Sequence, residues 1–117
     1  MVITINRVKR ITINGNDPIE NFIDNLEKED AAKVIDRLEM LNKYGLSLGP
    51  PYIKQLQNHE LWEFRVSYRR NQYRIIFFLY NDFIVLLHGF KYKDKIPENE
   101  IKIALERKKT LLKNLND

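Results

Sequence analysis

The sequence predicts an α+β fold, because its hydrophobic pattern changes period along the chain. Apolar residues recur at helical spacing over residues 19–41, whereas residues 61–90 show the alternation and continuous apolar runs typical of strands. A second helical stripe begins after Pro97. The links between the predicted strands are short, which favours an antiparallel meander. We therefore expect an N-terminal strand and helices, then a meander, then a closing C-terminal helix.

The first half of the chain predicts one strand and a helical hairpin. Residues 1–14 alternate crudely between apolar and polar residues, which fits one strand or a short hairpin. Asp17 suits an N-cap, and Pro18 suits the first helical position. Helical spacing holds over residues 19–26 and resumes over residues 31–41 after a polar run. Two helices joined by a tight corner fit this pattern, and one kinked helix remains an alternative.

The second half predicts three strands and a last helix. A loop rich in Gly and Pro is expected over residues 46–55. The strands are expected over residues 61–68, 73–80 and 83–90, and Asn81-Asp82 is expected to connect the last two as a hairpin. The closing helix carries acidic residues in its first turn and lysines near its end, as the helix dipole favours.

Length and composition exclude several classes of protein. The chain has 117 residues, so we expect residues 1–117 to form a single domain. It has no cysteine, which excludes a disulfide scaffold, a thiolate nucleophile and a zinc–thiolate site. The first ten residues lack the apolar run of a signal peptide, and no apolar stretch is long enough to span a membrane. A cytoplasmic protein without membrane contact is therefore expected.

Charge is unevenly distributed along the chain. The formal net charge of +4 and the pI of about 9.3 permit a polyanionic partner. Residues 17–44 carry eight acidic and four basic side chains. Residues 65–95 carry seven basic side chains and two acidic ones. The protein therefore has a chemically distinct basic half, which coincides with the predicted sheet.

Metal catalysis and serine hydrolysis have little support in the sequence. The two histidines, His59 and His88, lie far apart in sequence, and no acidic cluster accompanies either. They could pair as the acid and base of a ribonuclease, but His88 shares strand parity with Ile84, Leu86 and Phe90. A core or supporting imidazole is the favoured interpretation. There is no G-x-S-x-G motif. We expect neither a metal nor a cofactor.

Basic residues of the predicted sheet are the best candidates for chemistry. Arg65 lies on the strand face opposite Trp62 and Phe64, so we expect it to be displayed. Arg74 opens an apolar strand, where a guanidinium costs free energy unless it is satisfied. If the strands pair in sequence order, these arginines converge with the following lysines on one surface, which suits a phosphodiester undergoing cleavage. The lysines are Lys91, Lys93 and Lys95.

The alternative is that these charges have no catalytic purpose. Each could be an ordinary surface charge, or could form an ion pair with a nearby carboxylate. The carboxylates within reach in the sequence are Glu60, Glu63 and Glu98.

Several motifs occur together in a specific order. In the second half they are Leu61-Trp62-Glu63-Phe64-Arg65, Tyr73-Arg74-Ile75, Leu86-Leu87-His88-Gly89-Phe90-Lys91, and Pro97 with Glu100-Ile101 and Ala104. Upstream they are Gly15, Pro18, Phe22 and Leu26, followed by residues 38–45 and 49–56. This ordered set resembles the phage-derived HigB branch of the RelE/ParE toxin superfamily over about residues 15–112.

The resemblance implies both a fold and a function. It implies a RelE-like fold and the toxin of a type II toxin–antitoxin system, neutralised by a helix-turn-helix antitoxin (HigA-like). It further implies an mRNA endoribonuclease that acts in the ribosomal A site through attack by a 2′-hydroxyl, without a metal, and so inhibits translation. Two other functions stay open: a ParE-like toxin that poisons gyrase without cleaving RNA, and a basic RNA-binding or regulatory module.

The same resemblance implies roles for individual residues. Arg74 and Lys91 would stabilise the phosphate, Arg65 would contact the phosphate or the leaving group, and Lys93 would serve proton transfer. These four residues form the expected catalytic set. Residues expected to bind RNA or the ribosome are Lys54, Tyr92 and Lys95.

One departure from the family pattern affects the lysines. The branch usually shows two adjacent lysines, whereas here Tyr92 separates Lys91 from Lys93. Which lysine takes which role therefore stays open. Tyr92 could stack on a base or pack locally, and its strand parity, which differs from that of the lysines, favours packing.

Overall fold

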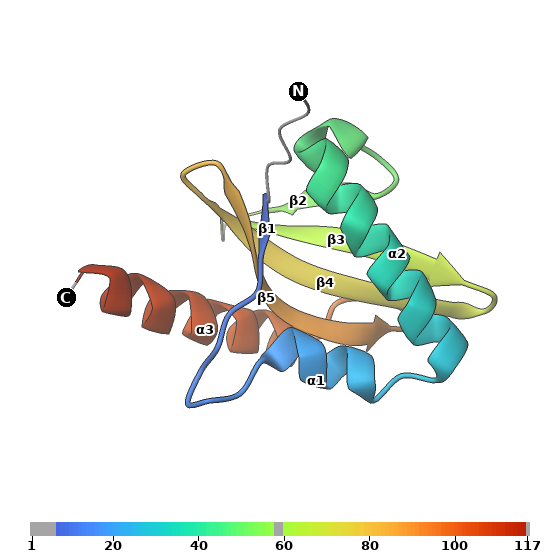
Figure 1. Ribbon diagram of the computed structural model, residues 1–117, viewed down its shortest axis with the longest axis horizontal. Coiled ribbons are helices and arrows are strands. Elements are labelled where there is room, and N and C mark those ends of the chain that lie inside the picture. The colour runs from blue at the N-terminus through green and yellow to red at the C-terminus, as the bar shows by residue number, and fades with distance from the viewer. Residues whose placement is uncertain (1–6, 58–59, 117) are drawn as a thin grey trace, which may run out of the picture.

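The computed structural model describes residues 7–57 and 60–116 and has an α+β architecture (Figure 1), as predicted. Its elements are, in chain order, β1 (Val8–Lys9), α1 (Pro18–Asp24), α2 (Lys28–Tyr44), a short 3₁₀ helix (Gly45–Leu48), β2 (Ile53–Leu56), β3 (Leu61–Tyr68), β4 (Asn71–Tyr80), β5 (Phe83–Tyr92) and α3 (Glu98–Asn116).

The five strands form one mixed sheet in the order β1-β5-β4-β3-β2. Strands β2 to β5 make the antiparallel meander that the short links indicated, and β1 pairs in parallel with β5. In the N-terminal part, only Val8–Lys9 forms a strand among the described residues up to position 14. The earlier part of the expected strand, residues 1–6, lies outside the described residues.

Strand β4 begins at Asn71, two residues before its expected start at Tyr73, and two further predicted boundaries were wrong. The segment expected to be a loop up to residue 55 contains the start of β2, because the backbone of Tyr52 accepts a hydrogen bond from the Arg65 amide and Ile53 is buried in the core. The strand expected to end at Phe90 continues to Tyr92, which pairs with Gln72 on β4. Both errors come from strand pairing, which local sequence signals do not encode.

Capping explains why the helical hairpin forms where predicted. The Asp17 carboxylate accepts hydrogen bonds from the backbone amides of Ile19 and Glu20, and Pro18 occupies the first turn of α1. Helix α1 ends at Asp24 and α2 begins at Lys28, so the two-helix interpretation is confirmed over the kinked helix.

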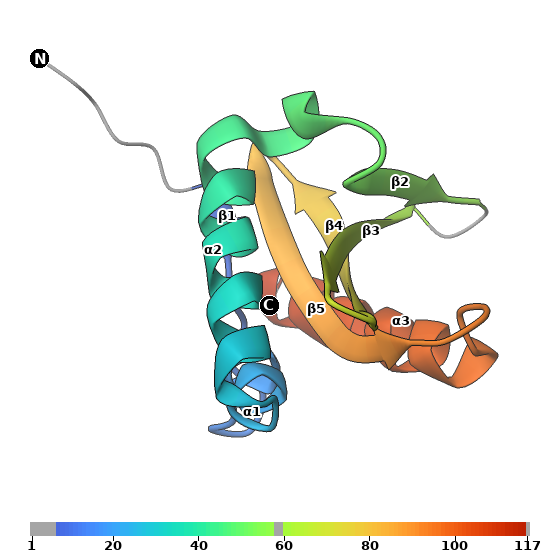
Figure 2. The same ribbon diagram turned by 90° about the vertical axis from the view of Figure 1, so that its right-hand side faces the viewer.

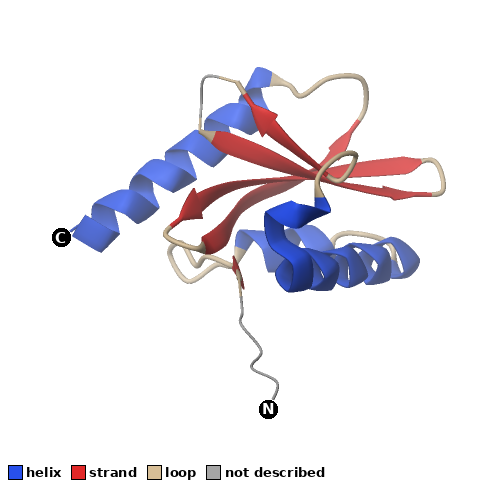
Figure 3. Cartoon of the chain, turned by 90° about the horizontal axis from the view of Figure 1, so that it is seen from above, coloured by secondary structure: helices blue, strands red, loops and turns tan. Residues whose placement is uncertain are grey.

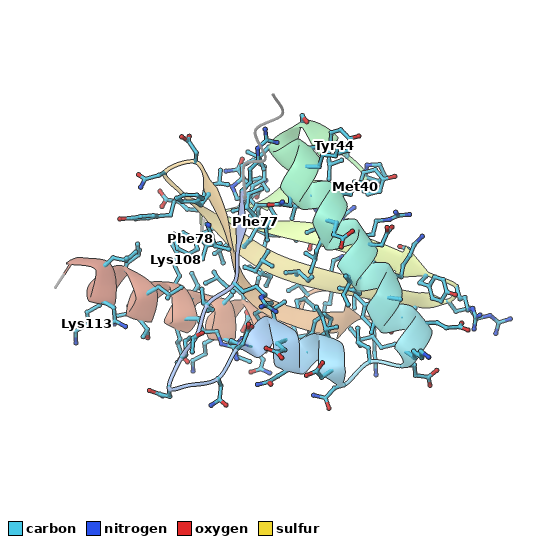
Figure 4. All side chains as sticks on the ribbon, in the orientation of Figure 1. Met40, Tyr44, Phe77, Phe78, Lys108 and Lys113 are labelled. Carbon is cyan, nitrogen blue, oxygen red and sulfur yellow. The ribbon has the colours of Figure 1, made fainter. Side chains whose placement is uncertain are left out.

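The helices cover opposite faces of the sheet (Figures 2 and 3). Helices α1 and α2 pack on one face, which we call the hairpin face, and α3 packs on the other, the α3 face. Phe77 and Phe78 are adjacent on β4 and belong to the two different cores (Figure 4). The sheet therefore separates two hydrophobic cores, and the parity of each strand residue decides which one it enters.

A β-bulge in β5 changes that parity. Ile76 pairs with His88, but the next β4 residue, Phe77, pairs with Leu86, so Leu87 is an extra residue in the ladder. Leu86 consequently enters the hairpin-face core, whereas His88 and the residues after it are shifted by one position. His88 was predicted to share a face with Ile84 and Leu86. This prediction is wrong, because the bulge shifts His88 to the other face of the strand.

Gly89 is required for the close packing of α1 on β5. A Cβ atom at Gly89 would lie 2.5 Å from Cδ2 of Phe22, inside the ring's van der Waals envelope. We expect Gly89→Ala to lower the free energy of unfolding by about 1–3 kcal/mol through overpacking, as measured by urea denaturation. Adding Phe22→Leu should recover part of the loss, and a wild-type midpoint for Gly89→Ala alone would contradict this packing argument.

Candidate functional site: an arginine cleft on the sheet

Arg65 and Arg74 lie side by side on neighbouring strands. They are direct cross-strand partners in the β3–β4 ladder. Arg74 is also the partner of Phe90, which belongs to the α3-face core, so both arginines project from the α3 face. The Arg65 side chain is 33% exposed, as its predicted display requires, whereas Arg74 is buried.

The Arg74 guanidinium is held by polar and aromatic groups. Its Nη1 donates to the backbone oxygen of Tyr73 at 3.2 Å and its Nη2 donates to Oε1 of Gln72 at 3.1 Å. The central carbon lies 4.0 Å from the ring centroid of Tyr92, a cation–π geometry. Burial lowers the pKa of Arg74, while the nearby Glu63 carboxylate opposes that effect. These contacts offset the cost of burying a guanidinium.

Glu63 joins the two arginines from the same face. Its Oε1 lies 2.7 Å from Nε of Arg65 and 3.8 Å from Nε of Arg74. The pairing of Arg65 with Glu63, left open as an alternative to a catalytic purpose, is therefore present. This ion pair leaves the Arg65 side chain partly exposed, and Arg65 also lines a cleft.

This cleft has a volume of about 330 Å³ and opens where β2 stops pairing with β3. Three arginines, a serine and a glutamine make up five of its seven lining residues, and the other two come from the loop before β2. The lining residues are Arg37, Pro51, Tyr52, Arg65, Ser67, Gln72 and Arg74. Three arginines thus line one small hollow, an arrangement suited to a phosphate or another anion.

Residues 21–109 match the family model described as "Phage derived protein Gp49-like (DUF891)". The chain belongs to this family. Gp49-like proteins are phage-derived and toxin-like, and the family is associated with the RelE toxin superfamily. A toxin-like family implies an antitoxin partner. No curated protein matches the chain.

The sequence gives no direct indication of Arg37, which lines the cleft, or of Glu63, which contacts the two strand arginines without lining it. Arg37 comes from α2, in the acidic half of the chain, and nothing in its spacing connects it to a strand 28 positions later. The sequence presents Glu63 only as a possible ion-pair partner of the basic residues. Its signal was its parity with Arg65, because residues two apart on a strand share a face.

The lysines do not all join the arginines. Lys91 is the cross-strand partner of Tyr73, so it projects from the hairpin face, and its charge contributes to lowering the pKa of Asp30 there. The expected convergence of the basic residues on one surface therefore fails for Lys91, because β4 and β5 place it opposite Tyr73 rather than Arg74. Lys93 and Lys95 are exposed on the loop between β5 and α3.

The candidates for RNA or ribosome binding lie near the arginines or just beyond them. Lys54 on β2 is the cross-strand partner of Glu63, so it shares the α3 face with the arginine pair. Tyr92 packs against Arg74, and its hydroxyl donates to the backbone oxygen of Asp94 at 2.6 Å. One ring face of Tyr92 is thus occupied locally, in the way its parity indicated.

A second polar cluster connects α2 to the β3–β4 hairpin on the hairpin face. The Tyr73 hydroxyl donates a short hydrogen bond to buried Asp30, and Nδ2 of Asn71 donates to the same carboxylate oxygen at 2.9 Å. The Tyr73 and Asn71 hydrogen bonds lower the pKa of Asp30, against its desolvation. Burial, followed by the Asp30 hydrogen bond, raises the pKa of Tyr73 to about 12. This cluster fixes the start of α2 against the hairpin that carries both arginines.

His88 connects β5 to α3. Its Nε2 lies 3.0 Å from Oε2 of Glu100, and Nη1 of Arg107 donates to Nδ1 at 3.1 Å. Burial lowers the pKa of His88, which matches a neutral ring that accepts at Nδ1 and donates at Nε2. These contacts fit the interpretation that the His88 imidazole supports the structure, here by joining β5 to α3. The other histidine, His59, lies outside the described residues, so the proposed acid–base pair cannot be placed.

Within residues 7–57 and 60–116, no group of three or more His, Asp or Glu side chains is arranged to hold a metal ion. Over the same part of the chain, no helix has the length and apolar character needed to cross a membrane.

Proposed function

We propose that this protein is the toxin of a type II toxin–antitoxin system and acts as a HigB-like, ribosome-dependent mRNA endoribonuclease. The observation that carries the proposal is the pair of arginines fixed side by side at one cleft, in a protein of a toxin-like family. Arg65 is partly exposed at the cleft. Arg74 is buried beside it and is held by the Tyr73 carbonyl, the Gln72 amide and the Tyr92 ring. Fixed cations of this kind stabilise charge that develops in a transition state.

The proposed reaction is an internal displacement at phosphorus. The 2′-hydroxyl oxygen bonds to phosphorus, the bond to the 5′-oxygen breaks, and the hydroxyl proton ultimately balances the leaving 5′-oxygen. The products are a 2′,3′-cyclic phosphate and a 5′-hydroxyl. Arg65 and Arg74 would neutralise the growing charge on the phosphoryl oxygens. DNA lacks the 2′-hydroxyl, so selectivity for RNA follows from the same chemistry.

The lysines complete the proposal in different ways. Lys93 is proposed for proton transfer from its exposed loop. Lys91 is proposed for phosphate stabilisation, which requires the RNA to pass around the end of β5, because Lys91 projects from the hairpin face. Lys54, Tyr92 and Lys95 are proposed to bind the RNA backbone or the ribosome, which would hold the mRNA in place and reduce the demand on built-in acid–base groups.

Partner and location belong to the same proposal. The antitoxin is proposed to be a helix-turn-helix protein of the HigA type, and the site of action is the cytoplasm, where translating ribosomes are found. A short helix-turn-helix reading frame next to the gene would support this pairing.

Primer extension on mRNA from cells that express the protein tests the function. We expect new 5′ ends inside translated codons with the wild type, and their loss with Arg65→Ala, because the variant removes the more exposed guanidinium of the cleft. Arg70→Ala is the matched control, since Arg70 is an exposed arginine of the β3–β4 turn outside the cleft, and it should cleave like the wild type.

Intact mRNA during growth arrest would overturn the nuclease proposal. Supercoiling defects in the same cells would then assign the protein to the ParE-like group that poisons gyrase. Ribosome or RNA binding without either effect would assign it to the basic RNA-binding modules.

A further inference from the structure

Glu63 is a buried carboxylate in the middle of the basic site. Only 2% of its surface is exposed, and it lies two residues before Arg65 on the same face of β3. The cleft is lined by Arg65 and Arg74, while Glu63 lies behind them and does not line it. A group in this place acts on the arginines and not on a molecule bound in the cleft.

The contacts of Glu63 fix how the guanidinium of Arg65 is turned. A guanidinium carries Nε on one edge and its amino groups at the far end. Oε1 of Glu63 lies 2.7 Å from Nε of Arg65 and 3.8 Å from Nε of Arg74, so the carboxylate contacts the Nε edge of each guanidinium. The amino end of Arg65 is thereby left for the cleft.

Electrostatics gives the carboxylate a second effect. Arg65 and Arg74 are cross-strand partners, and like charges placed directly opposite repel each other. The negative charge of Glu63 lies beside both and reduces this repulsion in an environment of low polarity. Without it the two guanidiniums would tend to separate, and one phosphate could no longer meet both.

Two polar atoms of Glu63 and Arg74 are left without hydrogen bonds. Within the described part of the chain, Oε2 of Glu63 and Nε of Arg74 are buried and have no hydrogen-bond partner. Buried polar atoms without partners cost free energy, so an arrangement selected for stability alone would pair them. A function that needs both arginines in one orientation accounts for the cost.

We propose that Glu63 is a positioning residue that aligns Arg65 and Arg74 for simultaneous contact with one phosphodiester. The inference rests on the proposed nuclease function, and it adds a carboxylate to a site so far defined by cations. Glu63 does not touch the RNA and transfers no proton. It sets the direction and spacing of the two guanidiniums before the RNA arrives.

Glu63→Gln separates positioning from simple charge balance. The variant raises the net charge of the site by one, so it should bind an RNA oligonucleotide with 2′-O-methyl groups as tightly as the wild type or more tightly. Its single-turnover cleavage of ribosome-bound mRNA should nevertheless fall at least about 10-fold, because the guanidiniums lose their alignment. Glu60→Gln is the matched control: the same change at a carboxylate whose side chain is 93% exposed, and it should leave both values unchanged.

A double-mutant cycle identifies the partner through which Glu63 acts. If Glu63 works by holding Arg65, then Glu63→Gln should lower the rate by less than about 2-fold in an Arg65→Ala background, since groups that act as a unit are non-additive. A full, additive loss in that background would overturn the proposal. So would wild-type cleavage by Glu63→Gln.

A third measurement needs neither ribosome nor cleavage. In NMR spectra of the arginine Nε–Hε groups, wild-type signals of Arg65 and Arg74 should shift together when inorganic phosphate is added, and in Glu63→Gln the two should respond separately. If the wild type fails to cleave mRNA but shows the joint shift, the proposed function fails and the positioning inference stands. If phosphate shifts only one signal in the wild type, the positioning inference fails.

Folding of the variant is checked by far-UV circular dichroism. If Glu63→Gln does not fold, Glu63→Asp replaces it, because aspartate keeps the charge but withdraws the carboxylate by one carbon. Its cleavage rate should then fall while oligonucleotide binding is retained. A wild-type rate for Glu63→Asp would contradict the proposal.

Discussion

Arg74→Lys is expected to lower the rate of mRNA cleavage by about 10²-fold or more, the scale seen when a preorganised transition-state donor is lost. Lysine keeps the positive charge but has no planar group to stack on Tyr92, and it cannot bond the Tyr73 carbonyl and Gln72 in a fixed plane. The cation would remain near the cleft without a defined direction. Single-turnover cleavage of a defined mRNA on purified ribosomes measures the effect.

Arg69→Lys is the control for that measurement. Arg69 lies in the exposed β3–β4 turn and pairs with Glu29 at 2.5 Å, so the same substitution there should leave the rate unchanged. Ribosome binding should also keep its salt dependence in Arg74→Lys, because the charge is preserved. A cleavage rate within about 3-fold of the wild type would show that charge alone suffices at Arg74, and that fixed geometry does not matter there.

The second large effect concerns stability at alkaline pH. In the folded protein Tyr73 has a pKa of about 12, above its ordinary value of 10.0, so the folded state holds this proton more tightly than the unfolded chain. The resulting stability is fully present below pH 10 and is lost as the pH rises towards 12. Since one pKa unit corresponds to about 1.4 kcal/mol, the loss should be on the order of 3 kcal/mol.

Urea denaturation between pH 9 and pH 12 measures this loss. Tyr73→Phe should be less stable than the wild type at neutral pH, because Asp30 loses a hydrogen bond, and should lose less stability as the pH rises. Tyr44→Phe, at an exposed tyrosine, should follow the wild-type slope, which accounts for lysine titration common to all variants. Equal slopes for Tyr73→Phe and the wild type would contradict the prediction.

Elements with strong local signals could be predicted from the sequence. Asp17 and Pro18 marked the start of α1, and Asn81-Asp82 marked the β4–β5 hairpin. The interruption of the apolar stripe after Leu26 marked the corner between the helices, although residues 28–30 of the polar run belong to the first turn of α2. Each of these features is specified within a few residues by hydrogen bonding or backbone preference. The order of the meander followed from the short links.

Features that depend on pairing between strands could not be predicted in the same way. The bulge at Leu87 is visible only in the register of β5 against β4, and one extra residue was enough to place His88 on the other face. Likewise β2 exists because Ile53–Leu56 meets β3, although its own sequence is short and follows two prolines.

The same distinction applies to the candidate site. Pairing of the strands in sequence order predicts that Arg65 and Arg74 lie close together, and they are cross-strand partners in the structure. The placement of Lys91 on the opposite face follows from register, which the sequence leaves open. Arg37 reaches the cleft from a helix, and its contribution is a tertiary contact without a local signal.

The short outer strands of the sheet have a consequence for solubility. Over the part of the chain that the structure describes, the sheet ends in β1, with two residues, and β2, with four, and each of these strands carries a lysine, Lys9 and Lys54. An outer strand is a template on which a second polypeptide can add by backbone hydrogen bonding, and brevity and lysine both oppose that addition. A longer, uncharged outer strand would present more unpaired backbone groups for such addition, and so for fibril-like assembly. We therefore expect Lys54 on β2 to oppose self-association at this edge of the sheet.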